Sequence, residues 1–265
     1  MQSIKVQCPA KINLTLKVIN KRKDGFHNIE SIMQTINLFD YLTISVEDNT
    51  ENQILLSGNS TEIPYNEKNL IYKAGILYLE KTEIKNKKIS VYIDKNIPVS
   101  AGLAGGSTNA AGMLYGLNKL FNEKLSVTEL HKLCAELGSD LNFCLKGGCM
   151  MTKGRGEILE PSEYNHFTVN LIKPINLGIS AKEAYTKFAQ KISQGNTGRE
   201  NFVNDLEWAV LGDYEELKHI KNKYPKSIMT GSGSTYYSLE EKFEEETNFW
   251  VKNNLETINY GVQII

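Results

Sequence analysis

The sequence predicts an α+β protein, and three observations support this class. Residues 4–18 alternate apolar and polar side chains with the period of two that is typical of a β-strand. Residues 88–97 form a second strand-like run, which leads through a glycine-rich turn into a helix with apolar positions at helical spacing. Residues 161–265 then alternate strand-like and helix-like segments, as a compact α+β unit would.

Length and composition favour two domains. A chain of 265 residues that is 41% hydrophobic and 23% charged can bury one large core or two modest ones. The pattern of segments changes near Pro161, so we predict an N-terminal domain of residues 1–160 and a C-terminal domain of residues 161–265.

The N-terminal half is predicted to combine an antiparallel sheet with three helices. Asp24-Gly25 is a turn signal after the first strand, and the strand-like positions of residues 29–46 are broken at Asp40. Gly138 is a typical C-terminal stop for the last helix. The predicted helices cover residues 69–81, 110–121 and 128–137.

The C-terminal half is predicted to alternate strands and helices. Glycines at 231 and 233 interrupt two short strands within residues 227–239. The acidic run 240–246 indicates the start of a helix that continues through Trp250, because carboxylates are stabilised at the positive end of a helix dipole. The other predicted segments are strands at 166–172 and 260–265, helices at 181–192, 204–211 and 214–223, and a surface loop at 194–198.

Charge and targeting patterns exclude several classes of partner. A formal net charge of −1 provides no general attraction to nucleic acid or to anionic membranes, so we expect neither as a partner. The sequence shows neither the charged and apolar pattern of a leader nor a run of about 18 apolar residues, so we expect a cytoplasmic protein. We expect this protein to be a monomer or a weak homodimer. The cysteines, Cys8, Cys134, Cys144 and Cys149, lack metal-binding spacing even with His131, and reduced, buried thiols are expected.

The glycine-dense stretch 97–111 predicts a phosphate site. A helix N-terminus presents unpaired N–H groups and the positive end of the helix dipole, which together favour an anion. Gly102, Gly105 and Gly106 can adopt positive φ, while Ser107 and Thr108 can cap the helix or bind a phosphate oxygen. The stretch matches neither the P-loop pattern nor the dinucleotide fingerprint. The alternative is a plain strand-to-helix connection.

Three further features carry candidate chemistry. Lys11 and Asn13 project from the same face of the first strand, where they could reach one ligand or simply face solvent. Asp140 follows a helix end and precedes an apolar run, so it is either a buried carboxylate that needs a cationic partner or a helix cap. Residues 231–233 either bind a second anion or close a hairpin.

Together, the ordered motifs of the chain resemble those of the GHMP kinases. The resemblance implies an N-terminal domain like domain 2 of ribosomal protein S5, a C-terminal GHMP-type α+β domain and an active site in the cleft between them. Lys11 and residues 24–27 narrow it to the members with a cytidine-diphosphate substrate. The motifs are Pro9-Ala10-Lys11-Ile12-Asn13-Leu14, Asp24-Gly25-Phe26-His27, the loop 98–108, Gly138-Ser139-Asp140, Gly154-Arg155-Gly156-Glu157, Asn204-Asp205-Leu206-Glu207 and Gly231-Ser232-Gly233.

The resemblance implies transfer of the γ-phosphoryl group of ATP, with Mg²⁺, to a hydroxyl of 4-diphosphocytidyl-2-C-methyl-D-erythritol, in the non-mevalonate route to isoprenoid precursors. Asp140 would be the general base and Lys11 its charge partner. Asn13 would bind substrate, Phe26 would stack on the cytosine, His27 would contact the base edge and Tyr185 would cover the other face. The implied ATP-binding residues are Pro98, Val99, Ser100, Ala101, Gly102, Leu103, Ala104, Gly105, Gly106, Ser107 and Thr108.

The sequence departs from the family pattern at a few positions. Phe26 stands where tyrosine is usual, which preserves stacking, and Asn142 follows Leu141 where Val-Pro is common. Ala104 replaces a loop glycine and is expected to keep a negative φ. Two alternatives remain, namely another GHMP kinase of the homoserine or mevalonate type and a non-catalytic ligand-binding homologue. The metal ligands are not identified by the sequence.

Overall fold

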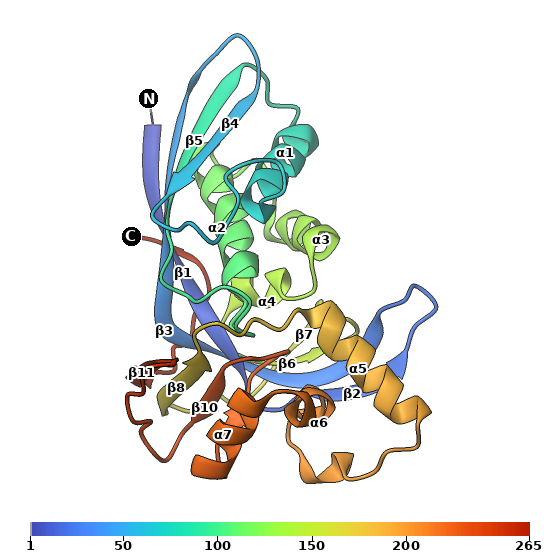
Figure 1. Ribbon diagram of the computed structural model, residues 1–265. Helices are drawn as coiled ribbons and strands as arrows, with labels where there is room; N and C mark the ends of the chain where they lie inside the picture. Colours follow the sequence, from blue (N-terminus) through green and yellow to red (C-terminus); the bar gives the residue numbers. More distant parts are fainter. Residues whose placement is uncertain (1) are drawn as a thin grey trace.

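A computed structural model describes residues 2–265, in which helices pack against two β-sheets (Figure 1). The larger sheet contains β1 (Gln2–Asn13), β2 (Lys17–Lys21), β3 (His27–Asp48), β4 (Gln53–Gly58), β5 (Lys87–Asp94), β6 (Cys149–Lys153), β7 (Ile158–Pro161) and β12 (Gln263–Ile264). The smaller sheet contains β8 (Thr168–Pro174), β9 (Ile228–Met229), β10 (Tyr236–Ser238) and β11 (Phe249–Glu256). This arrangement confirms the predicted α+β class.

The helices are close to those predicted. Those of the N-terminal half are α1 (Leu70–Thr82), α2 (Gly105–Leu120), α3 (Val127–Leu137) and the short α4 (Leu141–Lys146). Those of the C-terminal half are α5 (Ala181–Ser193), α6 (Asp205–Val210) and α7 (Glu215–Lys223). Asn69 caps α1 by accepting a hydrogen bond from Ile71 N, and Gly138 ends α3 as expected.

Strand β3 organises the larger sheet, because it pairs with β1, β2, β5 and β6 along its length. The predicted break at Asp40 is wrong, since β3 continues without interruption from His27 to Asp48. Its pairing with β1 is irregular close by, since Pro9 is opposite Phe39 and the next residue, Ala10, is opposite Ile36, which leaves two residues of β3 without a partner in β1. The chain also leaves β1 at Asn13, so the predicted strand 4–18 is divided between β1 and β2.

Helix α2 lies directly on β1 and carries the glycine-rich turn at its N-terminus. Two glycines permit this close approach: a Cβ atom on Gly116 would come within 2.6 Å of Ile44 Cδ1, and one on Gly112 would overlap the Cys8 sulfur. Helices α1 to α4 cover one face of the sheet (Figure 1). The packing of α2 therefore fixes where its N-terminal N–H groups point. All four thiols are free and buried, as predicted.

The acidic run 240–246 does not begin a helix, which corrects the sequence-based prediction. Its carboxylates bind lysines of and beyond α7: Lys223 Nζ lies 2.6 Å from Glu244 and 2.9 Å from Glu246. Phe243, within the run, is buried edge-on against Tyr224. Lysines thus pair with Glu240, Glu244 and Glu246 in a segment that is neither helix nor strand, and residues after 248 form β11. The predicted hairpin of residues 227–239 is present as β9 and β10.

The end of the chain returns to the first strand, where Val6 of β1 is paired with Ile264 of β12. Leu16 and Val18 in turn belong to the apolar core built by α5, α6 and α7. The division at residue 160 stays a prediction. Among residues 2–265, every helix is too short or too polar to cross a membrane.

A buried ion pair anchors the segment that leads to α2. The carboxylate of Asp40, which is 0% exposed, accepts hydrogen bonds from Asn96 N at 2.7 Å, Ile97 N at 2.8 Å and Lys95 Nζ at 2.7 Å. Asp40, which the sequence pattern treats as a break in the strand, thus holds the backbone of the segment that follows β5.

We predict that Asp40→Asn lowers the free energy of unfolding by about 3–5 kcal/mol, because it leaves the charge of Lys95 buried without its partner. Urea unfolding followed by circular dichroism measures this difference. Glu240→Gln, which removes the exposed partner of Lys226, is the control and should cause no measurable change. A loss below about 1 kcal/mol in Asp40→Asn would contradict the assigned role.

Candidate active site

A cleft of about 1130 Å³ lies where the two sheets and the N-terminus of α2 meet. It is lined by the predicted catalytic residues Lys11 and Asp140 and by the predicted substrate residues Asn13, Phe26, His27 and Tyr185. It is also lined by the predicted loop residues apart from Leu103 and Thr108, which are buried in the interior. The fold therefore brings together segments as far apart in the chain as Lys11 and Ser232.

The lining of the cleft is strongly cationic. Asp140 is the single carboxylate among the described residues that line it, whereas the cationic residues are Lys11, Lys21, Lys95, Arg155 and Lys182. The net charge of the whole chain does not reveal this local excess. Such a surface suits a ligand that carries several negative charges.

The glycine loop reaches α2 through three residues with positive φ, namely Ser100, Gly102 and Ala104. Gly102 has φ +74°, as predicted, but Gly105 and Gly106 are helical and do not have positive φ. Ala104, the last of the three, has φ 59° and ψ 27°, so the prediction that it keeps a negative φ is wrong. A non-glycine residue in this region costs roughly 1 kcal/mol. The chain accepts this cost because Ala104 is the N-cap where the extended loop must turn into α2.

The two helical glycines of the loop differ in their surroundings. A Cβ atom on Gly105 would lie 2.8 Å from Lys95 Nζ and 3.1 Å from Ile97, so this glycine is needed for packing. A Cβ atom on Gly106 would meet no atom within 4 Å, and Gly106 faces the cleft. Ser107 follows within the first turn of α2 rather than at its cap. The open space beside Gly106 is therefore the place where an anion can approach the helix N-terminus.

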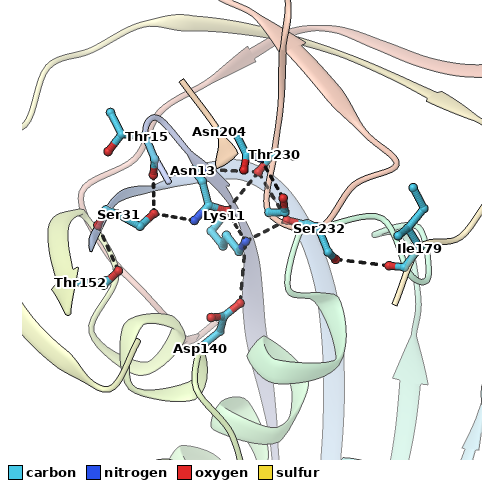
Figure 2. Close-up of polar contacts among 12 residues, drawn as sticks. Lys11, Asn13, Thr15, Ser31, Asp140, Thr152, Ile179, Asn204, Thr230 and Ser232 are labelled. Atoms are coloured by element: carbon cyan, nitrogen blue, oxygen red, sulfur yellow. Dashed lines mark hydrogen bonds and ion pairs between the residues drawn. The ribbon is translucent and has the colours of Figure 1, made fainter. Parts of the chain in front are cut away.

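Lys11 is the central polar group of the cleft (Figure 2). It is only 3% exposed, and its Nζ donates to Asn13 Oδ1 at 2.6 Å and to the carbonyl oxygen of Gly102 at 2.9 Å. Asp140 Oδ2 lies 3.7 Å from the same nitrogen. A buried ammonium needs such partners, since its desolvation is costly. Lys11 thus joins the first strand, the glycine loop and α4.

Asp140 stands between α3 and α4 with its carboxylate free of the helix. It is the N-cap residue of α4 by position, but its side chain makes no capping hydrogen bond. This excludes the alternative that the side chain of Asp140 serves as a helix cap. The side chain is 29% exposed toward the cleft, so one oxygen faces Lys11 while lone pairs remain accessible to a ligand.

Asn13 is held in one orientation by neighbours that the sequence did not identify. Its Nδ2 donates to Ser31 Oγ at 2.7 Å, and Ser31 Oγ donates to the carbonyl oxygen of Thr15 at 2.5 Å. Its backbone N–H donates to Thr230 Oγ1 at 2.9 Å. These bonds turn the Asn13 carbonyl toward Lys11. Ser31 lies in a segment without any sequence signal for a site, and Thr230 directly precedes the motif 231–233 but lies outside it, so the tertiary structure reveals both contacts.

Residues 231–233 both close the β9–β10 hairpin and line the cleft, so the two alternatives offered by the sequence are compatible in space. Gly231 lies against Lys11, since a Cβ atom there would be 3.1 Å from Lys11 Nζ. Ser232 Oγ donates to the carbonyl oxygen of Ile179 at 3.3 Å, just before α5 (Figure 2).

The aromatic side of the cleft is formed by the β2–β3 hairpin and α5. Phe26 is 49% exposed, and the guanidinium of Arg155 lies 4.9 Å from its ring centre. Tyr185 stacks on His27, with ring centres 5.0 Å apart and planes inclined by 13°. In the absence of ligand Tyr185 therefore faces His27. Arg155 was not singled out as a site residue, although its glycine-flanked motif was noted.

The imidazole of His27 is neutral at pH 7. Burial lowers the pKa of His27 below its ordinary value of 6.5, and the positive charge of Lys21 lowers it further. A neutral ring offers one donor and one acceptor nitrogen, which suits contact with the edge of an uncharged base.

We expect NMR titration of the His27 ring protons to give a pKa below 6.5. The folded state then binds fewer protons than the unfolded state in this pH window, so His27 contributes to a loss of stability as the pH falls below 6.5. Lys21→Gln should raise the His27 pKa part of the way back, because burial remains. A His27 pKa at or above 6.5 would show that neither effect operates.

Comparisons with known proteins place this geometry in a family. Residues 69–150 match the model of the GHMP kinases N terminal domain. Among solved structures, a 4-(cytidine 5'-diphospho)-2C-methyl-D-erythritol kinase has a TM-score of 0.73 at 24% identity, with 97% of this chain and 100% of that chain covered. Homoserine kinase from Cytophaga hutchinsonii has the same TM-score at 17% identity, with 100% and 98% covered. The N-terminal family model and the fold of these neighbours are those of the GHMP kinases.

Sequence similarity identifies one family within this class. A 4-diphosphocytidyl-2-C-methyl-D-erythritol kinase from Prochlorococcus marinus subsp. pastoris is 36% identical over 98% of this chain and 97% of its own length. The kinase of the same name from Alkaliphilus oremlandii is 34% identical over the full length of both chains. The chain belongs to the 4-diphosphocytidyl-2-C-methyl-D-erythritol kinase family, which confirms the resemblance carried by its motifs.

Proposed function

We propose that this protein is an ATP-dependent kinase that phosphorylates a hydroxyl of 4-diphosphocytidyl-2-C-methyl-D-erythritol, a step toward isoprenoid precursors. Family membership supports the reaction, and one observation in the site carries its chemistry. The buried ammonium of Lys11 lies 3.7 Å from the carboxylate of Asp140. Among the described residues that line the cleft, Asp140 is the single carboxylate, and the other charged residues are cationic. Such a pair supplies the proton acceptor and the positive charge that transfer of a phosphoryl group to an alcohol uses.

Asp140 acts as the general base in this proposal. The substrate hydroxyl oxygen forms a bond to the γ-phosphorus of ATP, the bond from that phosphorus to the β,γ-bridging oxygen breaks, and the hydroxyl proton moves to the Asp140 carboxylate. The charge of Lys11 offsets the negative charge of the Asp140 carboxylate and stabilises negative charge at the reacting oxygens. Asn13 and the carbonyl of Gly102 hold Lys11 in place for both tasks.

The N-terminus of α2 binds the phosphates of ATP in this proposal. The first turn of α2 has N–H groups without helical partners, and a Cβ atom on Gly106 in this turn would meet open space, so backbone donors and the helix dipole both favour an anion here. Lys95, which lines the same part of the cleft, is held by Asp40, whose carboxylate offsets its charge. Binding and orientation are therefore supplied by the backbone more than by side chains.

The site fits a magnesium ion that is held mainly by substrate. Among residues 2–265, no group of three His, Cys, Asp or Glu side chains could hold a metal by itself. Mg²⁺ typically takes only one or two carboxylates and otherwise binds phosphate oxygens and water. Asp140 and the hydroxyl of Ser107 are the side chains that would hold it. When bound, it would neutralise charge on the transferring phosphate.

The cytidine-diphosphate end of the substrate is assigned to the aromatic side. Phe26 offers an exposed ring face for stacking, and neutral His27 offers a donor and an acceptor for the base edge. Tyr185 would cover the base once it separates from His27. Lys21, Arg155 and Lys182 supply positive charge for the diphosphate.

We further propose, from the sequence patterns, that the protein works in the cytoplasm as a monomer or weak homodimer with domains of residues 1–160 and 161–265. No nucleic acid or membrane partner is required for the reaction.

Coupled detection of ADP release with a panel of alcohols tests the function. We expect turnover with the cytidylylated methylerythritol and little with homoserine or mevalonate. Preference for homoserine would support the alternative of another GHMP kinase, whose fold is equally similar. ADP release with none of the three would support a non-catalytic ligand-binding protein.

We predict that Asp140→Asn and Lys11→Ala each lower kcat by at least about 10²–10⁴-fold, because each removes a group that acts in the transition state. ATP affinity, measured by equilibrium titration, should stay within a few-fold of the wild-type value. A kcat close to wild type in folded Asp140→Asn would remove this residue from the mechanism.

Two substitutions should distinguish the part of the cleft that binds ATP from the part that binds the cytidine substrate. Gly106→Val should weaken ATP binding without unfolding the protein, because the new side chain occupies only the open space meant for phosphate. Phe26→Ala should raise KM for the cytidine substrate by about ten-fold or more and leave ATP binding intact, since stacking on an aromatic ring is worth about 1–3 kcal/mol.

Phe26→Tyr, which keeps the aromatic ring, is the matched control and should leave KM for the cytidine substrate nearly unchanged. Melting temperatures of all variants accompany the kinetics. Equal losses for both substrates together with a lowered melting temperature in Phe26→Ala would indicate a packing role and contradict the cytosine assignment.

A further inference from the structure

The motif Asn204-Asp205-Leu206-Glu207, at the start of α6, has no role in the reaction proposed above. The side chains of Asn204, Asp205 and Glu207 are all buried. Asp205 accepts a hydrogen bond from Val18 N at 2.7 Å and so holds the base of β2. Buried polar groups need partners, so the remaining contacts of the segment show what else it fixes in place.

Asn204 uses the two ends of its carboxamide for different tasks. Its Oδ1 accepts a hydrogen bond from Leu206 N at 2.9 Å and caps α6. Its Nδ2 donates to the carbonyl oxygens of Met229, at 2.7 Å, and Gly231, at 2.8 Å. The donor end therefore contributes nothing to the helix and holds only the loop after β9.

Glu207 holds the same loop from within α6. Its Oε2 accepts a hydrogen bond from Met229 N at 3.1 Å, and its Oε1 lies 3.3 Å from Lys221 Nζ. Met229 is thus fixed at both its N–H and its C=O by side chains of one short segment.

The loop that is held in this way touches the catalytic network. Thr230 Oγ1 accepts the backbone N–H of Asn13 at 2.9 Å, and a Cβ atom on Gly231 would lie 3.1 Å from Lys11 Nζ. Figure 2 shows Asn204, Thr230, Lys11 and Asp140 in one view. A displacement of the loop would therefore disturb both the partner of Asn13 and the wall against the Lys11 ammonium.

We propose that Asn204 is a positioning residue for phosphoryl transfer. By holding the carbonyls of Met229 and Gly231, it keeps Thr230 and Gly231 against Asn13 and Lys11, and so keeps the ammonium of Lys11 directed at Asp140. Asn204 does not touch the cleft itself. The inference rests on the proposed function, because it assigns to Asn204 an effect that passes through Lys11.

Asn204→Asp separates the two tasks of the side chain. It retains the oxygen that caps α6, but an ionised carboxylate cannot donate to Met229 and Gly231. We expect kcat to fall by about 10–100-fold, because small displacements of catalytic groups have effects of this size. Binding of ATP should stay within two-fold of wild type. Because burial at position 204 raises the pKa of the new carboxyl, the loss relative to wild type should grow between pH 6 and pH 9, as ionisation removes its last donor.

A double-mutant cycle tests whether the effect passes through Lys11. In the Lys11→Ala background, Asn204→Asp should lower kcat by less than about two-fold, since the group that it positions is already absent. A loss in this background as large as that in wild type would overturn the proposal, and so would a wild-type kcat in folded Asn204→Asp. A wild-type kcat in Lys11→Ala would instead overturn the proposed function.

Asn118→Asp is the matched control. Asn118 is 5% exposed and holds the backbone of Leu125 at both N–H and C=O, but it does not line the cleft. It should lower the melting temperature without a pH-dependent loss of kcat. Should Asn204→Asp not fold, Thr230→Val removes the hydroxyl between the loop and Asn13, and the same loss of kcat is expected. A wild-type kcat in that variant would overturn the proposal.

Discussion

The arrangement of the candidate active site depends on one buried cation, the ammonium of Lys11. Removing the ammonium of Lys11 from water costs several kcal/mol unless close partners compensate for it. Those partners come from β1, from the glycine loop through Gly102 and from the start of α4 through Asp140. Because no one element can supply all three, the sheet, the loop and the helix must meet at this point. The active site is therefore also the place where the tertiary structure is tied together.

Other buried polar groups extend the same principle outward. Asp40 fixes the chain before the glycine loop by accepting two backbone N–H groups and pairing with Lys95. Asn204 fixes the loop on the other side of Lys11 through two backbone carbonyls. In both cases a side chain satisfies the backbone of an irregular segment, which would otherwise carry unpaired groups into the interior. Loops that must stay in one conformation for catalysis are thus held by side chains from regular elements.

The electrostatics of the cleft follow from this arrangement. One carboxylate among the described lining residues stands within a cationic surface, so its ionised form is compensated and a polyanionic ligand is still attracted. The helix N-terminus adds backbone donors at the place where Gly106 leaves room. These features together make one end of the cleft suitable for triphosphate and the aromatic end suitable for a nucleobase.

The sequence by itself determined the class of fold and most helices, because periodicity is a local property of the chain, and the resemblance of its ordered motifs to a known family grouped Lys11, Asp140 and the glycine loop in one predicted site. Tertiary structure decided the rest. Asp40 continues a strand because distant Lys95 neutralises it, residues 240–246 do not form a helix because lysines near α7 bind them, and Ala104 adopts a positive φ because a packed helix follows it. Each outcome depends on a partner remote in sequence, and no local pattern encodes where that partner lies.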